Sequence, residues 1–297
     1  MPGTYIDAPA IGHNTLLTQD VQYGLDGNDQ LLSSEATFYA EGGRGNDFIG
    51  LIVNVTGSVE LYGGQGNDQV FGRQGVLDKL YGGEGDDWLV AASANLNADG
   101  SITPIETSGV DYMEGGAGSD ALYGFDGNDQ LYGGGGDDKG TIQVPHVDTW
   151  TTGTLQSIKA GLFGGDGNDE IHGGGGDDDI HGGNGNDMMW GDGGADQFFF
   201  DTALNAGSNV DKIADFSRDD GDTILLSETI FDGIGPSLAK NEFVLGSKAK
   251  DGNDHLLFNQ KKGFVYYDED GKGGEKAVHF ATVEKGMSLA HTDFDMV

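Results

Sequence analysis

The sequence predicts an all-β protein: a parallel β-roll, which is a right-handed β-solenoid of nine-residue repeats, followed by a β-rich C-terminal cap. Three observations support this prediction. A pattern G-G-x-G-x-D-x-U-x, with U a large apolar residue, recurs along the chain. Glycine is frequent, at 55 of 297 residues, and 50 acidic residues stand against 15 basic ones. The repeat defines the architecture, and the excess negative charge must be compensated before the chain can fold.

Each repeat reads as a turn followed by a short strand. Glycines at the first, second and fourth positions tolerate the positive φ angles of a tight turn. The last three residues alternate as in a strand, so the eighth residue points inward. Two repeats then make one coil around a narrow apolar core. The expected core residues are Leu31, Ile49, Val70, Leu89, Leu122, Leu131, Ile171, Ile180, Met189 and Phe198.

The sixth position of the clear turns is an aspartate. Stacking the coils at the strand spacing of about 4.8 Å brings alternate turns together, so their carboxylates repel unless a cation lies between them. Calcium suits this position because it takes about six to eight oxygen ligands. We therefore expect several Ca²⁺ ions. The expected carboxylate ligands are Asp29, Asp47, Asp68, Asp87, Asp120, Asp129, Asp138, Asp169, Asp178, Asp187 and Asp196.

These repeats resemble those of the RTX, or haemolysin-type, calcium-binding proteins, over roughly residues 20–200. In that family each ion lies between two stacked turns, bound by aspartates at position six and by carbonyl groups at positions two and four of one turn and one and three of the next. The resemblance implies three ligand sets: Asp169, Gly165 and Gly167 with Asp187, Gly182 and Asn184; Asp178, Gly174 and Gly176 with Asp196, Gly191 and Gly193; and Asp120, Gly116 and Gly118 with Asp138, Gly133 and Gly135. The alternative, a disordered glycine-rich tract, conflicts with the strict period.

Clear turns alternate with degenerate ones in the N-terminal half. We therefore expect Asp29, Asp47, Asp68 and Asp87 to line one edge of the roll and the opposite edge to be poor in metal there. The blocks that start at residues 115 and 164 have good turns on both edges.

Two insertions interrupt the repeats, at residues 91–114 and 141–163. The first places Asn95, Asn97, Asp99, Gly100 and Glu106 at the EF-hand spacing, but neither flank reads as a helix. A surface turn is therefore favoured there over a calcium loop. The second insertion is rich in β-branched and aromatic residues, which predicts a hairpin on the flank of the roll.

The expected organisation has three parts. Residues 1–19 form an N-terminal segment, either a small cap or an interaction strand, residues 20–200 form the roll, and residues 201–297 form the C-terminal cap. The last part resembles the C-terminal domain of RTX exoproteins, which implies an uncleaved type I secretion signal, and the final DFDMV is similar to that family's terminus. We therefore expect contact with type I secretion machinery and an extracellular or cell-surface location. The lack of a leader-like N-terminus, of cysteine and of a membrane-spanning apolar run agrees with this expectation.

Charge and motifs narrow the function. A net charge of −35 argues against nucleic acid as a partner. The motifs H-E-x-x-H and G-x-S-x-G are absent, and His172 and His181 belong to adjacent repeats that face opposite ways, so we expect no enzyme. The outward aromatic positions are either a docking surface or a consequence of β-propensity. The expected function is a non-catalytic surface or self-assembling protein; the alternatives are a binding protein for glycan or host targets and a cryptic enzyme.

Overall fold

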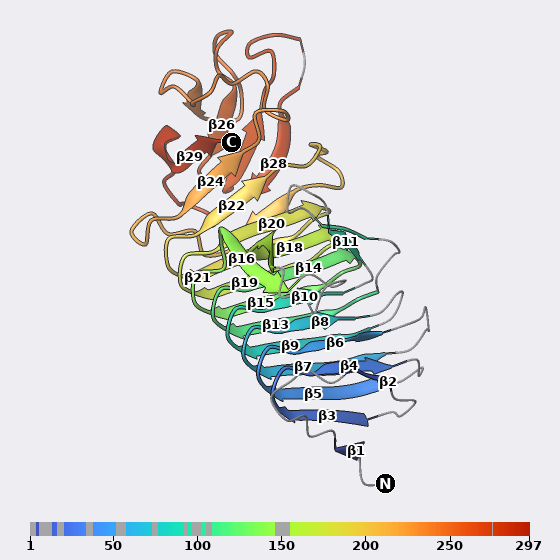
Figure 1. Ribbon diagram of the computed structural model, residues 1–297. Coiled ribbons are helices and arrows are strands. Elements are labelled where there is room, and N and C mark those ends of the chain that lie inside the picture. Colours follow the sequence, from blue (N-terminus) through green and yellow to red (C-terminus); the bar gives the residue numbers. More distant parts are fainter. Residues whose placement is uncertain are drawn as a thin grey trace.

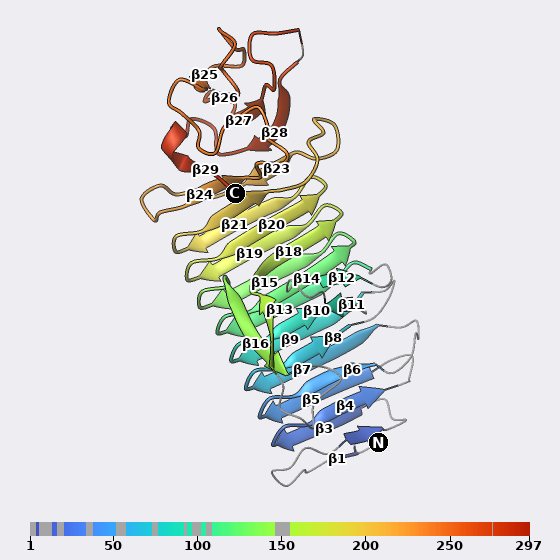
Figure 2. The ribbon, with the colours of Figure 1, turned by 45° about the horizontal axis from the view of Figure 1, so that its top comes forward.

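The computed structural model describes residues 4–5, 14–16, 21–33, 38–51, 58–72, 77–91, 94–96, 102–104, 109–145, 155–274 and 276–297. These residues form an elongated stack of short strands, with Thr4–Tyr5 at one end and the C-terminal part at the other (Figure 1). The turned view shows the coils one above another along the long axis (Figure 2). The predicted parallel β-roll is confirmed.

The chain passes alternately between two sheets, sheet A and sheet B. In spatial order, sheet A contains β1 (Thr4–Tyr5), β3 (Val21–Asp26), β5 (Phe38–Arg44), β7 (Val59–Gln65), β9 (Lys79–Glu84), β13 (Tyr112–Ala117), β15 (Gln130–Gly135), β19 (Glu170–Gly175), β21 (Met188–Gly193), β23 (Asp211–Ile213), β28 (Val278–Thr282), β27 (Phe264–Tyr267), β26 (Leu256–Asn259) and β25 (Phe243–Leu245). Sheet B contains β2 (Asn14–Leu16), β4 (Gln30–Ser33), β6 (Phe48–Leu51), β8 (Gln69–Phe71), β10 (Trp88–Val90), β14 (Ala121–Asp126), β18 (Gly161–Asp166), β20 (Asp179–Asn184), β22 (Gln197–Phe200), β24 (Thr223–Leu226) and β29 (Phe294–Met296).

The core lies between the two sheets and is built from the eighth repeat positions. All ten predicted core residues are buried, and the parallel register aligns them in columns, as for Leu131, Ile171 and Met189 in sheet A. The degenerate repeats also supply buried residues to the same core. These residues are Ala40, Leu61, Leu80 and Met113. The roll therefore stays continuous where the glycine pattern is weak.

Each insertion contains an antiparallel hairpin. In the second insertion β16 (Thr141–Pro145) pairs with β17 (Leu155–Lys159), as predicted. Its Ile142 and Ile158 pack on the outer face of sheet B, and the Tyr123 hydroxyl donates to the Lys159 carbonyl at 2.8 Å. This hairpin therefore covers one part of that face.

In the first insertion β11 (Ala94–Leu96) pairs with β12 (Ile102–Pro104). Asn95 lies opposite Thr103, so the described flanks of this loop are strands and not the helices of an EF-hand. Asn97, Asp99, Gly100 and Glu106 lie outside the described residues.

The two ends of the chain extend the same sheets. At the N-terminal end β1 pairs with β3 and β2 with β4, while the rest of residues 1–19 lies outside the described residues. At the other end β23, β24 and β29 continue the parallel stacks, and β26, β27 and β28 add antiparallel strands to sheet A. A single 3-10 turn, η1 (His291–Asp293), precedes β29 among the described residues. The apolar core continues without a break from Phe198 to Phe280.

Within the described residues, no helix has the length and apolar character needed to cross a bilayer.

Candidate metal sites along the turn edges

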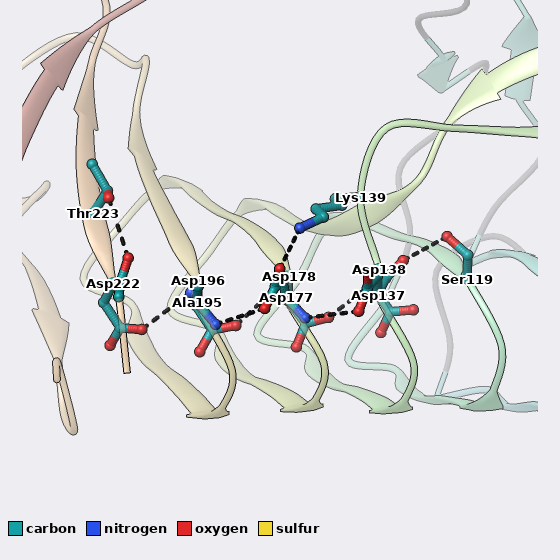
Figure 3. Close-up of polar contacts among 11 residues, drawn as sticks. Ser119, Asp137, Asp138, Lys139, Asp177, Asp178, Ala195, Asp196, Asp222 and Thr223 are labelled. Carbon is teal, nitrogen blue, oxygen red and sulfur yellow. Dashed lines mark hydrogen bonds and ion pairs between the residues drawn. The ribbon is translucent and has the colours of Figure 1, made fainter. Parts of the chain in front are cut away.

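The first turn edge, where sheet A passes into sheet B, carries a continuous ladder of aspartates. The backbone N–H of each position-six aspartate donates to Oδ1 of the aspartate in the next coil, at 2.7 to 3.1 Å. The ladder runs through Asp29, Asp47, Asp68, Asp87, Asp120, Asp138, Asp178, Asp196 and Asp222. Figure 3 shows its C-terminal steps, where Asp138, Asp178 and Asp196 lie in line.

The second turn edge, where sheet B returns to sheet A, carries a matching ladder. It starts at the Val59 N–H, which donates to Asp78 Oδ1 at 2.9 Å, and each later step is the same kind of bond, at 2.7 to 3.1 Å. Its members are Asp78, Asp111, Asp129, Asp169, Asp187 and Asp211. In the N-terminal half this edge is expected to be poor in metal; it carries the ladder aspartates Asp78 and Asp111 there, and its metal content stays a prediction.

Four ladder aspartates are not among the ligands predicted from the sequence. They are Asp78, Asp111, Asp211 and Asp222. Their turns contain glycine, such as Gly72 before Asp78 and Gly221 before Asp222, but not at the spacing of the repeat. Each is nevertheless followed by one residue and then a buried apolar residue, as in D-K-L, D-Y-M, D-K-I and D-T-I. The short pattern D-x-U would have found them.

In ten of the ladder aspartates the second carboxylate oxygen is buried and unpaired. Oδ2 has no hydrogen-bond partner in Asp47, Asp68, Asp87, Asp111, Asp120, Asp129, Asp138, Asp169, Asp178 and Asp187. Burial, reinforced by the Asp120 carboxylate, raises the pKa of Asp87 to about 9. Burial also raises the pKa of Asp129 to about 9, with Asp111 and Asp169 adding to the effect. An ionised carboxylate in this position costs several kcal/mol without a compensating cation.

Backbone carbonyl groups converge on the same oxygen atoms. A methyl group placed on Gly124 would lie 2.5 Å from the Gly164 carbonyl oxygen of the next coil and 2.6 Å from Asp129 Oδ2. The first position of the turn therefore has to be glycine, since a side chain would fill the space between these two oxygens.

The three predicted ligand sets are brought together in the same way. Gly116 and Gly118 direct their carbonyl oxygens at the turn that starts at Gly133, and the Gly133 carbonyl oxygen points back toward Asp120. Gly165 and Gly167 face the turn of Gly182 and Asn184, and Gly174 and Gly176 face the turn of Gly191 and Gly193. The position-three carbonyls already accept a hydrogen bond: Gly135 from Gly118 at 2.9 Å, Asn184 from Gly167 at 2.8 Å and Gly193 from Gly176 at 2.8 Å.

This donor set fits a hard cation. It offers carboxylate and carbonyl oxygens, and no described trio of Asp, Glu or His side chains clusters closely enough to hold a metal by side chains alone. Ca²⁺ accepts such mixed oxygen shells, whereas zinc and copper favour nitrogen and sulfur ligands. The assignment of ions to particular aspartates and glycines stays a prediction.

A further ladder at position five runs in the opposite direction. Here the N–H of the later coil donates to the side chain of the earlier one, as from Asn67 to Asn46 at 3.0 Å and from Asp177 to Asp137 at 3.1 Å. Lys139 reaches Asp177 at 2.8 Å (Figure 3), and this contact holds the pKa of Asp177 below its usual value. The repeat pattern treats position five as variable, although Asn or Asp occupies it in most clear turns.

Comparison with protein families agrees with the geometry. A protein whose stacked coils present buried carboxylates on both edges is, as a class, a β-solenoid with candidate cation sites in its turns. Residues 56–76, 78–95, 107–139 and 163–198 match the model of the RTX calcium-binding nonapeptide repeat, in 4 copies. The chain therefore contains RTX repeats, and the ion that these repeats bind is calcium. No curated protein matches the chain significantly.

Replacing Asp169 by Asn should weaken calcium binding far more than replacing Asp166 by Asn. Both changes remove one negative charge from the same turn, but Asp169 is a buried ladder member and Asp166 is exposed at position three. We expect the calcium midpoint of folding to rise at least severalfold for Asp169→Asn and to stay within about twofold for Asp166→Asn. Circular dichroism during calcium titration measures both. Equal shifts would contradict a specific ligand role for Asp169.

The calcium-free protein should gain structure on acidification. The folded pKa values of Asp178 and Asp87, about 6 and about 9, lie above the unfolded value of about 3.9. The metal-free folded state therefore binds more protons than the unfolded state, so its stability is fully present below pH 4 and is lost as pH rises toward 9. Calcium binds the ionised carboxylates. The calcium concentration at the midpoint of folding should therefore decrease when the pH is raised from 6 to 8. Circular dichroism of stripped protein that is independent of pH would refute this account.

Proposed function

We propose that the protein is a non-catalytic, secreted calcium-binding protein whose β-roll folds when calcium fills its turns outside the cell. One observation carries the proposal: both turn edges hold continuous ladders of buried aspartates, and ten of these aspartates have a second carboxylate oxygen without a partner. The matched RTX repeats support calcium as the ion.

Charge repulsion would keep the chain open where calcium is scarce. The sequence carries a net charge of −35, and the ladder carboxylates stack at the spacing of adjacent strands. At a free calcium concentration of 100 times the dissociation constant, each site would add about 2.7 kcal/mol to folding. Several such sites would convert an unstable chain into a stable roll, with the aspartates and turn carbonyls as ligands.

Export before folding is supported by the location of the C-terminal residues. In the folded protein β29 pairs with β24, Phe294 is buried, and Arg218 Nε donates to the Asp293 carboxylate at 2.8 Å. A secretion machinery that reads this segment, as the family resemblance implies for a type I system, would reach the Asp293 and Phe294 side chains more readily in the unfolded chain, although Asp295 and Val297 are exposed in the folded one. The absence of cysteine fits a chain that needs no oxidative folding.

A non-catalytic role is supported by the placement of the two histidines. His172 lies on sheet A, stacked between Tyr132 and Trp190, and His181 lies on sheet B, stacked between Phe163 and Phe199. Each ring contacts its own aspartate, at 3.1 Å for Asp192 and 2.9 Å for Asp201. They do not form a joint acid–base pair.

A surface or self-assembling role is supported by the open face of sheet A and by the strands at its N-terminal end. A column of partly exposed rings runs along the outer face, through Tyr39, Tyr62, Tyr81, Tyr112, Tyr132, His172 and Trp190. In the described part of the chain, β1 and β2 are the last strands of their sheets at that end. Terminal strands of this kind can pair with a neighbouring molecule.

Folding should require calcium. In chelator at neutral pH, circular dichroism should report a largely unfolded chain that gains β-structure at millimolar calcium, because the ladders then acquire their counter-ions. Magnesium should be a poor substitute, since it demands a small octahedral shell. A cooperatively folded protein in chelator at neutral pH would defeat the proposal.

Deleting residues 1–19 should abolish calcium-dependent assembly while sparing calcium binding by the downstream turns. Electron microscopy and sedimentation of the full chain, with and without calcium, provide the reference. A strict monomer at high protein and calcium concentration would instead favour a solitary binding protein, for glycan or host targets, over self-assembly.

A further inference from the structure

We propose that the C-terminal part holds a separate calcium site, formed by the turns at residues 251–254 and 268–274, outside the repeats and both ladders. Neither turn lies in a segment that matches the repeat model. The inference does not depend on the assignment of ions within the roll.

The two turns lie side by side at one end of a strand pair. β26 and β27 are antiparallel with Leu256 opposite Tyr267, so the residues before β26 and after β27 meet. The Asp268 N–H donates to the His255 carbonyl at 2.8 Å, and the Lys272 N–H donates to the Asp251 carbonyl at 2.8 Å. These bonds hold the acidic sequences D-G-N-D and D-E-D-G against each other.

A buried carboxylate oxygen in this place has no partner. Asp254 and Asp268 are 4% and 6% exposed, and Asp268 Oδ1 accepts no hydrogen bond. No described ion pair includes either residue. Burial raises the pKa of Asp268, a side-chain hydrogen bond with Asp270 and the Asp270 and Asp254 carboxylates raise it further, and His255 lowers it. Three carboxylates thus lie close together around a buried oxygen that accepts no hydrogen bond.

The surrounding donors are oxygens. Asp254 Oδ2 accepts the Lys250 and Asp251 N–H groups, and Asp270 Oδ2 accepts the Gly274 N–H at 2.8 Å. We take the free Asp268 Oδ1 and the adjoining Asp270 carboxylate as the first ligands. Gly271 has a φ of +60°, and a methyl group there would lie 2.8 Å from the Gly252 carbonyl oxygen and 2.9 Å from that of Asp251. This close approach brings backbone oxygens of one turn to the other. Two carboxylates, carbonyl oxygens and water make a shell suited to Ca²⁺.

Such an ion would join the two turns and so fasten β26 to β27. These strands are the antiparallel part of sheet A, which has neither of the aspartate ladders. The C-terminal part would then have a calcium requirement of its own.

The test counts ions bound to the full chain at saturating calcium, by equilibrium dialysis and elemental analysis. The double variant Asp268→Asn/Asp270→Asn should bind one ion fewer than the wild type. The control variant Asp219→Asn/Asp220→Asn removes the same charge from an exposed turn and should bind the wild-type number. Both should keep the circular dichroism of the β-roll. A double variant that binds as many ions as the wild type overturns the inference.

If the double variant does not fold, the single variant Asp270→Asn tests the site instead. The Asp270 side chain is exposed, so its replacement should leave the fold intact. It should raise the dissociation constant of one ion at least tenfold, and unchanged binding of all ions overturns the inference. Failure of the proposed function is recognisable separately, because the wild type itself would then bind no calcium.

Discussion

Each coil of the roll must hold a carboxylate close to the carboxylate of the next coil, and most other features serve to make that arrangement possible. Oδ1 is satisfied by a backbone N–H of the preceding coil, as for Asp120 and Asp138. Oδ2 is left to face turn carbonyls in a space that a Cβ atom would fill, as at Gly124. Glycine in the turn, aspartate at position six and an apolar residue two places later are thus parts of one solution to like-charge repulsion.

The fold could be predicted from the sequence where the local pattern and the packing agree. Leu131 and Met189 were predicted to point inward because the strand alternation is strict, and both are buried. Ala40 and Leu61 were not predicted, because the degenerate repeats change the spacing while the sheet register persists. The order of β25 to β28 could not be predicted either, since antiparallel pairing between distant segments leaves no periodic trace in the sequence.

The aspartates of the candidate site could be predicted where the glycines of the repeat precede them at the regular spacing. Asp87 and Asp169 were found through the full repeat, whereas Asp78 and Asp211 were missed because the glycines of their turns do not have the spacing of the repeat. In those turns the aspartate carboxylate still accepts a backbone N–H from the preceding coil. This bond depends on the stacking of the coils and not on the length of the turn. The position-five ladder was missed for a related reason: Asn46 and Asn67 contact residues 21 places away, and a nine-residue pattern contains no information about the adjacent coil.

The direction of the ladder bonds gives the stack a polarity. At position six every acceptor carboxylate belongs to the coil nearer the C-terminus, as when Asp178 donates to Asp196 and Asp196 to Asp222. A coil that is already in place therefore presents ready acceptors to the coil that precedes it in sequence, whereas the opposite face presents N–H groups. Coils added one by one toward the N-terminus would meet these position-six acceptors in turn, with the C-terminal strands as the template. Each added coil would close only its own short loop. The entropic cost of ordering the long solenoid would therefore be divided into small steps.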